Sequence, residues 1–403
     1  MKHIKQQFSI FSTNPDLVYI DNAATALVPD TVVKAIATYY TEYPANIHRG
    51  LYDISTKATR AYESSRKKVA DFIGAKSDEI IFTSGTTFGC NMIAQSLKSR
   101  LTSVDNIVIT RYEHHANLLP WQKIAQEIGC ELRIIDIIKD GEDAYTLDMQ
   151  SAQSCIDSNT KVVSIAYVSH VLGTITPVND IIALAKTVGA ISIVDAAQAV
   201  SHMPINVKDL DCDFLVFSGH KMYGPTGIGV VYGKKERLSS IEPYLLGGGM
   251  VKEVTDVSGI WKEAPEKFEA GTPPIASVIG LASAIDFIRG IGWENLQTHE
   301  KEITMYAHEK LKEVVDIIGP IDLEKRIGVF SFTILGIHPH DIAEVVNRDM
   351  VAIRAGHHCA IPLMTYLGVP GAARVSFAAY NTKEDIDILI GAIKKVKVLF
   401  TVK

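Results

Sequence analysis

Two apolar runs lead into residues that can do chemistry. The run 213–217 continues into Ser218-Gly219-His220-Lys221, and the run 191–194 ends at Asp195. Both runs are typical of strands, and the carboxyl end of a strand is where α/β sheets commonly hold ligands. A lone loop lysine usually faces solvent, so the inference depends on the two residues occurring together. Lys221 could bind pyridoxal phosphate (PLP) as a Schiff base, and Asp195 could keep the pyridinium nitrogen protonated.

A possible phosphate cradle lies earlier in the chain. Thr83-Ser84-Gly85-Thr86-Thr87 follows a predicted strand and opens an apolar helical stretch. Backbone amides and hydroxyl groups at a helix start favour an anion. The same residues could equally form an ordinary helix N-cap, for which Ser and Thr are preferred.

Histidines and a cysteine supply further candidates. His114 follows the predicted strand 106–110, and its imidazole could stack on a planar cofactor. In His357-His358-Cys359 the adjacent side chains lack the loop spacing of zinc sites, so we predict no metal. The imidazoles, with Arg354 nearby, could instead favour a nucleophilic thiolate on Cys359. The other four cysteines lie in apolar contexts and are predicted to be small core residues.

The composition is that of an enzyme-sized globular protein. The 403 residues include 40 Lys+Arg and 46 Asp+Glu, the net charge is −6, and 47% are hydrophobic. These values exclude a disordered or collagen-like chain and argue against nucleic acid as a partner. Five cysteines without a C-x-x-C pair favour a reducing compartment. Without a secretory signal or a run of about 18 apolar residues, we expect a cytoplasmic protein that makes no membrane contact.

The order of the elements predicts an α/β fold whose sheet is mostly parallel and covered on both faces. From Lys234 to Pro274, Gly and Pro residues predict connecting loops. The basic run Arg66 to Lys68 is expected on a solvated helix face. The seven predicted strands are Glu79 to Thr83, Asn106 to Thr110, Leu132 to Ile137, Lys161 to Tyr167, Ile191 to Asp195, Asp213 to Phe217 and Ile228 to Tyr232.

We expect three segments in the chain. Residues 1–25 form an N-terminal arm that packs with the small domain, and residues 26–285 form the large PLP-binding domain. Residues 286–403 form a smaller α+β C-terminal domain that carries the Cys359 loop.

The chain resembles a known family over nearly its whole length. It is similar to fold-type I PLP enzymes, and specifically to the SufS-type (group II, selenocysteine lyase-like) cysteine desulfurases of the class V aminotransferase family. The Ser-Gly-His-Lys stretch marks the wider class, whereas the Arg-x-Gly-His-His-Cys stretch is far more specific to this family. The motifs that carry the resemblance are Tyr19 to Ala24, His48 to Gly50, Thr83 to Thr87, Glu113 to Asn117, Val194 to Gln198, Phe217 to Lys221, Gly271 to Pro273, Arg354 to Ala360 and Arg374 to Ser376.

The resemblance implies a role for each matching residue. Lys221 would hold PLP and move protons at the substrate α-carbon, His114 would stack on the ring, and Asp195 would pair with its nitrogen. Cys359 would attack the sulfur of L-cysteine, leaving L-alanine and an enzyme persulfide. Further contacts are implied for Gln198 (ring hydroxyl), for Thr86, Thr87, Ser218 and His220 (phosphate), for Thr272 (phosphate of the neighbouring subunit), and for Arg374, Arg354 and His48 (substrate).

The resemblance also implies partners. The family is homodimeric and passes its persulfide sulfur to a SufE- or SufU-like acceptor for iron–sulfur cluster assembly. L-selenocysteine is an alternative substrate. Another lyase, epimerase or transaminase on the same scaffold, and a non-catalytic scaffold protein, stay open as alternatives at this point.

The chain departs from the family pattern at three positions. His170 stands where Asn is usual near the ring hydroxyl of the cofactor, Tyr52 replaces a second His, and Ile361 replaces a common Gln. A His at position 170 could still donate a hydrogen bond, but its charge would shift the titration of the bound cofactor.

Overall fold

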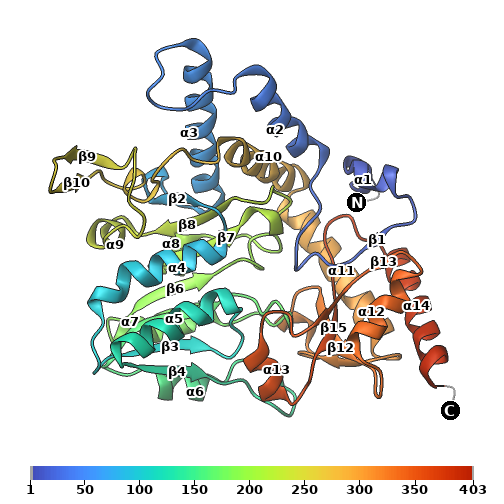
Figure 1. Ribbon diagram of the computed structural model, residues 1–403. Coiled ribbons are helices and arrows are strands. Elements are labelled where there is room, and N and C mark those ends of the chain that lie inside the picture. The colour runs from blue at the N-terminus through green and yellow to red at the C-terminus, as the bar shows by residue number, and fades with distance from the viewer. Residues whose placement is uncertain (1–2, 402–403) are drawn as a thin grey trace.

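A seven-stranded sheet lies at the centre of the larger part of the molecule (Figure 1). The computed structural model describes residues 3–401. The strands follow the order β2-β8-β7-β6-β5-β3-β4, and β8 alone runs antiparallel to its neighbours within this sheet. The predicted α/β class with a mostly parallel sheet is confirmed. The strands are β2 (Ile80–Thr83), β3 (Asn106–Thr110), β4 (Glu131–Ile135), β5 (Thr160–Ala166), β6 (Ile191–Asp195), β7 (Phe214–Ser218) and β8 (Gly229–Gly233).

Helices cover both faces of this sheet, because successive strand side chains enter two separate cores. Ile107 and Ile109 of β3 pack with α4 (Thr86–Leu97) and α5 (His115–Ile128). Val108, between them, packs in the opposite core with α7 (Val178–Thr187). Burial on both faces explains why the strands are almost continuously apolar. Outside residues 234–274, the other helices of this part are α2 (Asp30–Glu42), α3 (Asp53–Ile73), α6 (Met149–Cys155), α8 (Val207–Leu210) and α10 (Ile275–Ile291).

A smaller antiparallel sheet with its own apolar core forms the C-terminal part. Its strands, in the order β11-β12-β15-β14, are β11 (Asp316–Ile318), β12 (Val329–Thr333), β15 (Ala372–Ser376) and β14 (Arg354–Gly356). The accompanying helices are α11 (Trp293–Leu311), α12 (Pro339–Asn347), α13 (Ile361–Leu367) and α14 (Lys383–Thr401).

The amino-terminal segment lies against the C-terminal part. After α1 (Ser9–Thr13), β1 (Val18–Tyr19) pairs in parallel with β13 (Val351–Ala352). The domain boundaries at residues 25 and 285 stay a prediction. Residues 1, 2, 402 and 403 of the predicted segments lie outside the described residues.

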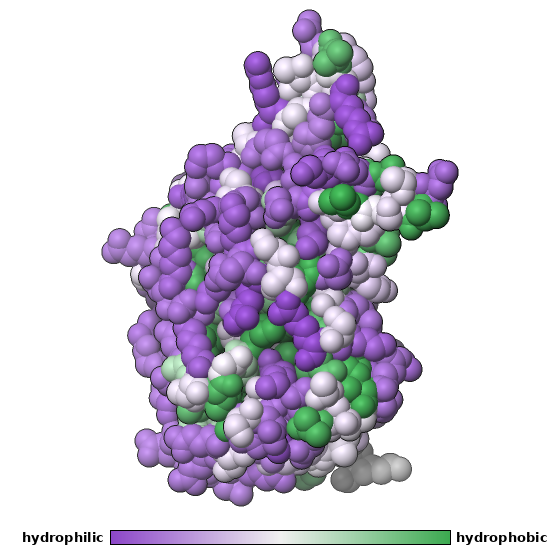
Figure 2. Space-filling model, turned by 90° about the vertical axis from the view of Figure 1, so that its left-hand side faces the viewer, coloured by the Kyte–Doolittle hydropathy of each residue, from purple (hydrophilic) through white to green (hydrophobic). Residues whose placement is uncertain are grey.

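The segment 234–274 is more structured than the sequence suggested. It contains α9 (Lys235–Ser240) and a hairpin of β9 (Val251–Val254) and β10 (Gly259–Trp261) that projects on the left of Figure 1. The prediction of connecting loops alone is therefore wrong. Both strands are short and mostly exposed, so their side chains show no burial alternation that a pattern could reveal. Figure 2 views this side, where hydrophobic patches lie among hydrophilic side chains.

Among residues 3–401, no single helix is long and apolar enough to cross a membrane. Helices α10 and α11 are long and apolar enough only when they are taken together, and the chain bends by 78° between them.

Candidate active site

Four neighbouring parallel strands end at one edge of the large sheet, and a candidate residue stands at or after each end. Lys221 lies in the 3-10 turn Gly219–Lys221 after β7, and Asp195 is the last residue of β6. His170 follows β5, and His114 follows β3. Because β2 is antiparallel to β8, and β8 to β7, Thr86 at the start of α4 belongs to the same edge. The fold thus gathers these residues where α/β sheets bind ligands.

Lys221 and Asp195 perturb each other in this partly closed setting. Burial lowers the pKa of Lys221, against the opposing effect of the Asp195 charge. Burial raises the pKa of Asp195, and the charge of Lys221 counteracts this rise. Asp195 Oδ1 accepts the Ala197 N–H at 2.9 Å, whereas no described residue donates to Oδ2. One carboxylate oxygen is therefore left for a cationic donor such as a protonated ring nitrogen.

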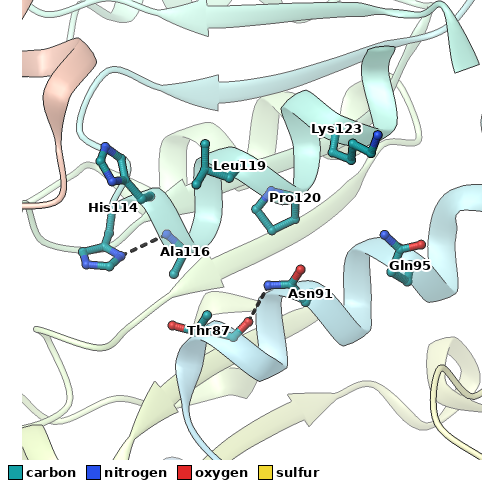
Figure 3. Close-up of a pocket in the computed structure, with 9 residues that line it drawn as sticks. Thr87, Asn91, Gln95, His114, Ala116, Leu119, Pro120 and Lys123 are labelled. Carbon is teal, nitrogen blue, oxygen red and sulfur yellow. Dashed lines mark hydrogen bonds between the residues drawn. The ribbon is translucent and has the colours of Figure 1, made fainter. Parts of the chain in front are cut away.

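His114 forms the N-cap of α5, where its Nδ1 accepts the Ala116 N–H at 3.0 Å. Burial, together with the positive charge of Lys221, lowers the pKa of His114 to about 3, so the ring is neutral near pH 7. His114 and Thr87 line a cavity of about 390 Å³ between α4 and α5 (Figure 3). A neutral aromatic ring in this position suits stacking on another flat ring.

Hydroxyl and amide groups gather at the amino end of α4. The Thr86 N–H donates to Ser218 Oγ at 2.8 Å, and the Thr86 hydroxyl lies 2.8 Å from the same oxygen. A Cβ on Gly229 would stand 2.4 Å from the Gly85 Cα, so only glycine lets this loop lie against β8. Burial and Lys221 lower the pKa of His220 to about 4. The group offers polar donors and a helix start to an anion.

Cys359 lies on a loop with unusual backbone geometry. His358 and Cys359 both have positive φ, 53° and 58°, although neither is glycine. The Cys359 carbonyl accepts the His115 N–H at 2.9 Å, and His115 Nε2 accepts the Ile361 N–H at 3.2 Å. Cys359 is the one exposed cysteine. Of the others, Cys90, Cys130 and Cys212 are buried and Cys155 is partly buried, as predicted for core residues.

Arg374 and Arg354 are opposite each other on β15 and β14 and share one carboxylate. Asp21 accepts from Arg354 Nη2 at 3.0 Å and from Arg374 Nη2 at 3.3 Å. Arg374 is buried, its Nη1 donates to the His170 carbonyl at 2.9 Å, and its Nε has no acceptor. Burial lowers the pKa of Arg374 to about 10. A buried donor without a partner is costly, and an incoming carboxylate could accept from it.

His170 corrects one expectation. Burial, with His114 and Arg374 nearby, lowers its pKa well below the usual value, so the expected charge on His170 is absent. Its Nε2 lies 2.7 Å from the His358 carbonyl oxygen, to which it must donate. The donor is therefore turned toward the Cys359 loop.

Three predicted site residues are less directly connected. Gln198 Nε2 donates to the Ala23 carbonyl at 2.8 Å. His48 and Thr272 line a second cavity of about 470 Å³. Within residues 3–401, no hydrogen bond or ion pair joins Gln198, His48 or Thr272 to Lys221. No group of three or more His, Cys, Asp or Glu among the described residues could hold a metal ion.

Two residues in the quoted motifs received no role from the sequence. Asp21 pairs with both arginines, and no pattern in the sequence links it to either of them. Glu113 is buried and accepts from Thr110 Oγ1, Asn117 Nδ2 and the Ala166 N–H at 2.6, 2.6 and 2.8 Å. It ties the ends of β3 and β5 to α5, directly beside His114. The sequence around Glu113 did not predict these three hydrogen bonds, because their donors come from separate elements of the fold.

Comparisons with known proteins identify the family of the chain. The family described as Aminotransferase class-V matches residues 18–389, so the chain belongs to that family. Within it, the expected resemblance to cysteine desulfurases is confirmed. The chain is 48% identical over 388 residues to a probable cysteine desulfurase of Halalkalibacterium halodurans, covering 95% of this chain and 94% of the relative. It is 45% identical over 389 residues to a cysteine desulfurase of Haloferax volcanii, covering 95% and 90%.

Solved structures give the same result. The apo structure of a cysteine desulfurase from Thermococcus onnurineus NA1 has a TM-score of 0.93 and 42% identity, covering 98% of this chain and 97% of that chain. The cysteine desulfurase CsdA from Escherichia coli has a TM-score of 0.90 and 35% identity, covering 98% of both chains. Class V aminotransferases of this type depend on PLP, which confirms the predicted cofactor.

The residues present fit that cofactor. Lys221, with its lowered pKa, can bind an aldehyde, and Asp195 keeps one oxygen free. The ring of His114 is neutral and can stack on a flat ring, and the start of α4 can receive a phosphate.

Proposed function

We propose that this protein is a PLP-dependent cysteine desulfurase that releases L-alanine from L-cysteine and keeps the sulfur as a persulfide on Cys359. One observation carries the proposal. The loop that bears exposed Cys359 is hydrogen-bonded to His115 and His170, which follow β3 and β5 at the same sheet edge as Lys221. A reachable thiol is thereby held beside the residues that suit the cofactor.

The residues at the sheet edge would handle the proton at the substrate α-carbon. Bound PLP supplies an electron sink that stabilises negative charge on that carbon. Lys221 would hold the cofactor through Nζ and then move the proton at the substrate Cα. The lowered pKa supports this role, since an unprotonated amine must be available to accept the proton. Asp195 would face the ring nitrogen with Oδ2, and His114 would stack on the ring.

The remaining cofactor contacts follow from position and donor type. The amino end of α4 and the turn after β7 would bind the phosphate, and the ring hydroxyl would lie near the buried polar side chains. We assign the phosphate to Thr86, Thr87, Ser218 and His220, and the phosphate of the neighbouring subunit to Thr272. We assign the ring hydroxyl to Gln198 and to Nδ1 of His170, because the Nε2–H of His170 donates to the His358 carbonyl.

Arg374 would bind the substrate carboxylate. Its buried Nε lacks an acceptor, and Asp21 and the His170 carbonyl fix the other two guanidinium nitrogens. We propose that exposed Arg354 adds positive charge at the entrance, and that His48 contacts substrate from the second cavity.

Cys359 would perform the sulfur transfer. Its thiolate attacks the substrate sulfur, an S–S bond forms and the C–S bond breaks. The electron pair of the C–S bond stays with the substrate β-carbon, which takes up a proton. Cys359-SH and L-cysteine thus give Cys359-S-SH and L-alanine, with no external oxidant or reductant.

We also propose a cytoplasmic homodimer that passes its sulfur to a SufE- or SufU-like acceptor for iron–sulfur cluster assembly. Exposed apolar side chains on the β9–β10 hairpin and before α3 support association with a second copy, since monomers rarely leave such groups uncovered. These side chains are Leu51, Tyr52, Val254, Val257 and Ile260. The exposure of Cys359 supports delivery of sulfur to a separate protein.

The test is to incubate the PLP-loaded protein with L-cysteine and to measure alanine and persulfide. We expect equal amounts of both, and loss of both in Cys359→Ala while the visible absorbance of bound cofactor is retained. Cys155→Ala is the matched control and should keep the activity. Undiminished alanine release by Cys359→Ala would refute the nucleophile, and a keto acid product would indicate a transaminase instead. Preference for L-selenocysteine would identify a selenocysteine lyase.

A further inference from the structure

His170 reaches from the sheet edge to the loop that carries Cys359. It lies in the connection after β5, is 5% exposed, and its ring meets His114 edge-on with 4.9 Å between ring centroids. Its Nε2 is 2.7 Å from the carbonyl oxygen of His358. Because a carbonyl oxygen only accepts, the proton of the neutral ring sits on Nε2.

The accepting carbonyl has a particular place in the loop. It belongs to the peptide that joins His358 to Cys359, the two consecutive residues with positive φ. Side chains with a Cβ rarely adopt this left-handed conformation, and it persists only where the surroundings hold it. The hydrogen bond from His170 therefore fixes the orientation of that peptide plane.

The other ties of the loop act on different groups. His358 Nε2 donates to the Ala372 carbonyl at 3.0 Å. His115 receives the Ile361 N–H and donates its own N–H to the Cys359 carbonyl. Neither replaces the bond to the His358 carbonyl, so losing the His170 side chain leaves that carbonyl without this donor.

The contact of His170 with Arg374 is separate from its side chain. Arg374 Nη1 donates to the main-chain oxygen of His170 at 2.9 Å. A substitution at position 170 can therefore disturb the Cys359 loop while the main-chain acceptor of Arg374 remains.

We propose that His170 is a positioning residue for Cys359: its Nε2–H holds the peptide between His358 and Cys359 and so aims the thiol at the substrate sulfur. The consequence for turnover rests on the proposed function, whereas the ordering of the loop does not.

The experiment is hydrogen–deuterium exchange on the full-length, PLP-loaded protein. His170→Asn carries its amide one bond nearer the backbone and cannot reach the carbonyl. We expect exchange over residues 357–361 to rise roughly tenfold, in keeping with the loss of one buried hydrogen bond. His170→Gln carries an N–H as many bonds out as His Nε2 and should restore the protection. His299→Asn is the matched control, because His299 also bonds a carbonyl, that of Asn381 at 3.0 Å, away from the loop.

Kinetics give a second readout. In His170→Asn we expect kcat for alanine release to fall roughly tenfold, with KM for L-cysteine changed less than about threefold because the main-chain acceptor of Arg374 remains. Unchanged exchange over residues 357–361 would overturn the proposal, as would a rise spread evenly over the chain. If the wild type released no alanine, the proposed function would fail, but the exchange result would still decide the role of His170 in the loop.

Discussion

Lys221 and Cys359, on which the proposed reaction depends, lie in opposite surroundings. Lys221 follows a regular strand, is partly buried, and burial lowers its pKa. Cys359 is exposed on a loop with left-handed backbone. An amine needs a poorly solvated site to lose its proton, whereas a thiol that hands sulfur to another protein must be reachable. In the proposed reaction, this difference separates a fixed region for the cofactor, around Lys221 and His114, from an accessible region for sulfur, the loop around Cys359.

The two regions also carry buried groups with opposite pKa shifts. Beside His114, burial raises the pKa of Glu113 to about 7. Beside Cys359, burial and the charge of Arg374 lower the pKa of His358 to about 3. The contribution of Glu113 to stability should therefore fall as the pH rises from 4.5 to 7, and that of His358 should fall as the pH drops from 6.5 toward 3.

The largest expected effect comes from the fixed region. Lys221→Ala should lower alanine formation by roughly 10²- to 10⁴-fold, because the proton at the substrate α-carbon loses its acceptor. The visible absorbance of covalently bound cofactor should disappear as well. Lys208→Ala, an exposed lysine outside the site, is the control and should match the wild type. Retained absorbance and activity in Lys221→Ala would contradict the assignment of Lys221 to the cofactor.

Arg374→Lys tests the arginine that spans the two regions. Lysine carries its three N–H donors on one nitrogen, so it cannot reproduce the spread of the guanidinium across Asp21, the His170 carbonyl and a substrate carboxylate. The lost charge-assisted bonds should raise KM for L-cysteine roughly 10- to 100-fold. Arg354→Lys, exposed on the neighbouring strand, should change KM less than about threefold. Equal effects of the two substitutions would contradict the assignment.

The acid response should come from the accessible region. The folded pKa of His358, about 3, lies below its ordinary value of 6.5. Between these values the unfolded chain binds the proton and the folded chain does not, so stability falls as pH drops from 6.5 toward 3. The loss should be on the order of 1 kcal/mol per pH unit, measured by urea unfolding. His358→Gln should flatten the slope, while His357→Gln, its exposed neighbour, should not.

The response in the fixed region should be smaller and of opposite sign. The folded pKa of Glu113, about 7, lies above its ordinary 4.5, so the folded chain keeps a proton that the unfolded chain releases. Stability should then fall as pH rises from 4.5 to 7 and level off above it. Glu113→Gln should remove this slope. A slope that remained in the variant would have to come from other groups.

The strands of the large sheet, and the sheet edge at which the candidate residues gather, were predictable because they depend on local sequence pattern. The runs that lead to Lys221 and Asp195 are apolar on both faces, and their ends gather candidates at one edge by the geometry of a parallel sheet alone. The hairpin at residues 251–261 was missed because its side chains are mostly exposed and carry no burial pattern.

Contacts between distant segments were not predictable. Arg66 was expected on a solvated helix face, but it is buried and bonds Glu269 through Nη1 and Nη2 at 2.7 and 2.8 Å. Its neighbours Lys67 and Lys68 do make exposed ion pairs. Likewise, no sequence pattern near Asp21 predicts its ion pairs with two arginines. The group to which His170 donates lies in a loop 188 positions away along the chain.

The carboxylate shared by Arg354 and Arg374 bears on the order in which the chain can mature. Asp21 and Arg374 are 353 positions apart in the chain. During synthesis from the amino end, β2 to β8 can assemble the edge that carries Lys221 long before Arg374 emerges. A growing chain would therefore acquire its cofactor residues first. Arg374, which we propose binds the substrate carboxylate, can meet Asp21 only after residue 374 has been synthesised, so a chain that stops before it would lack this proposed site.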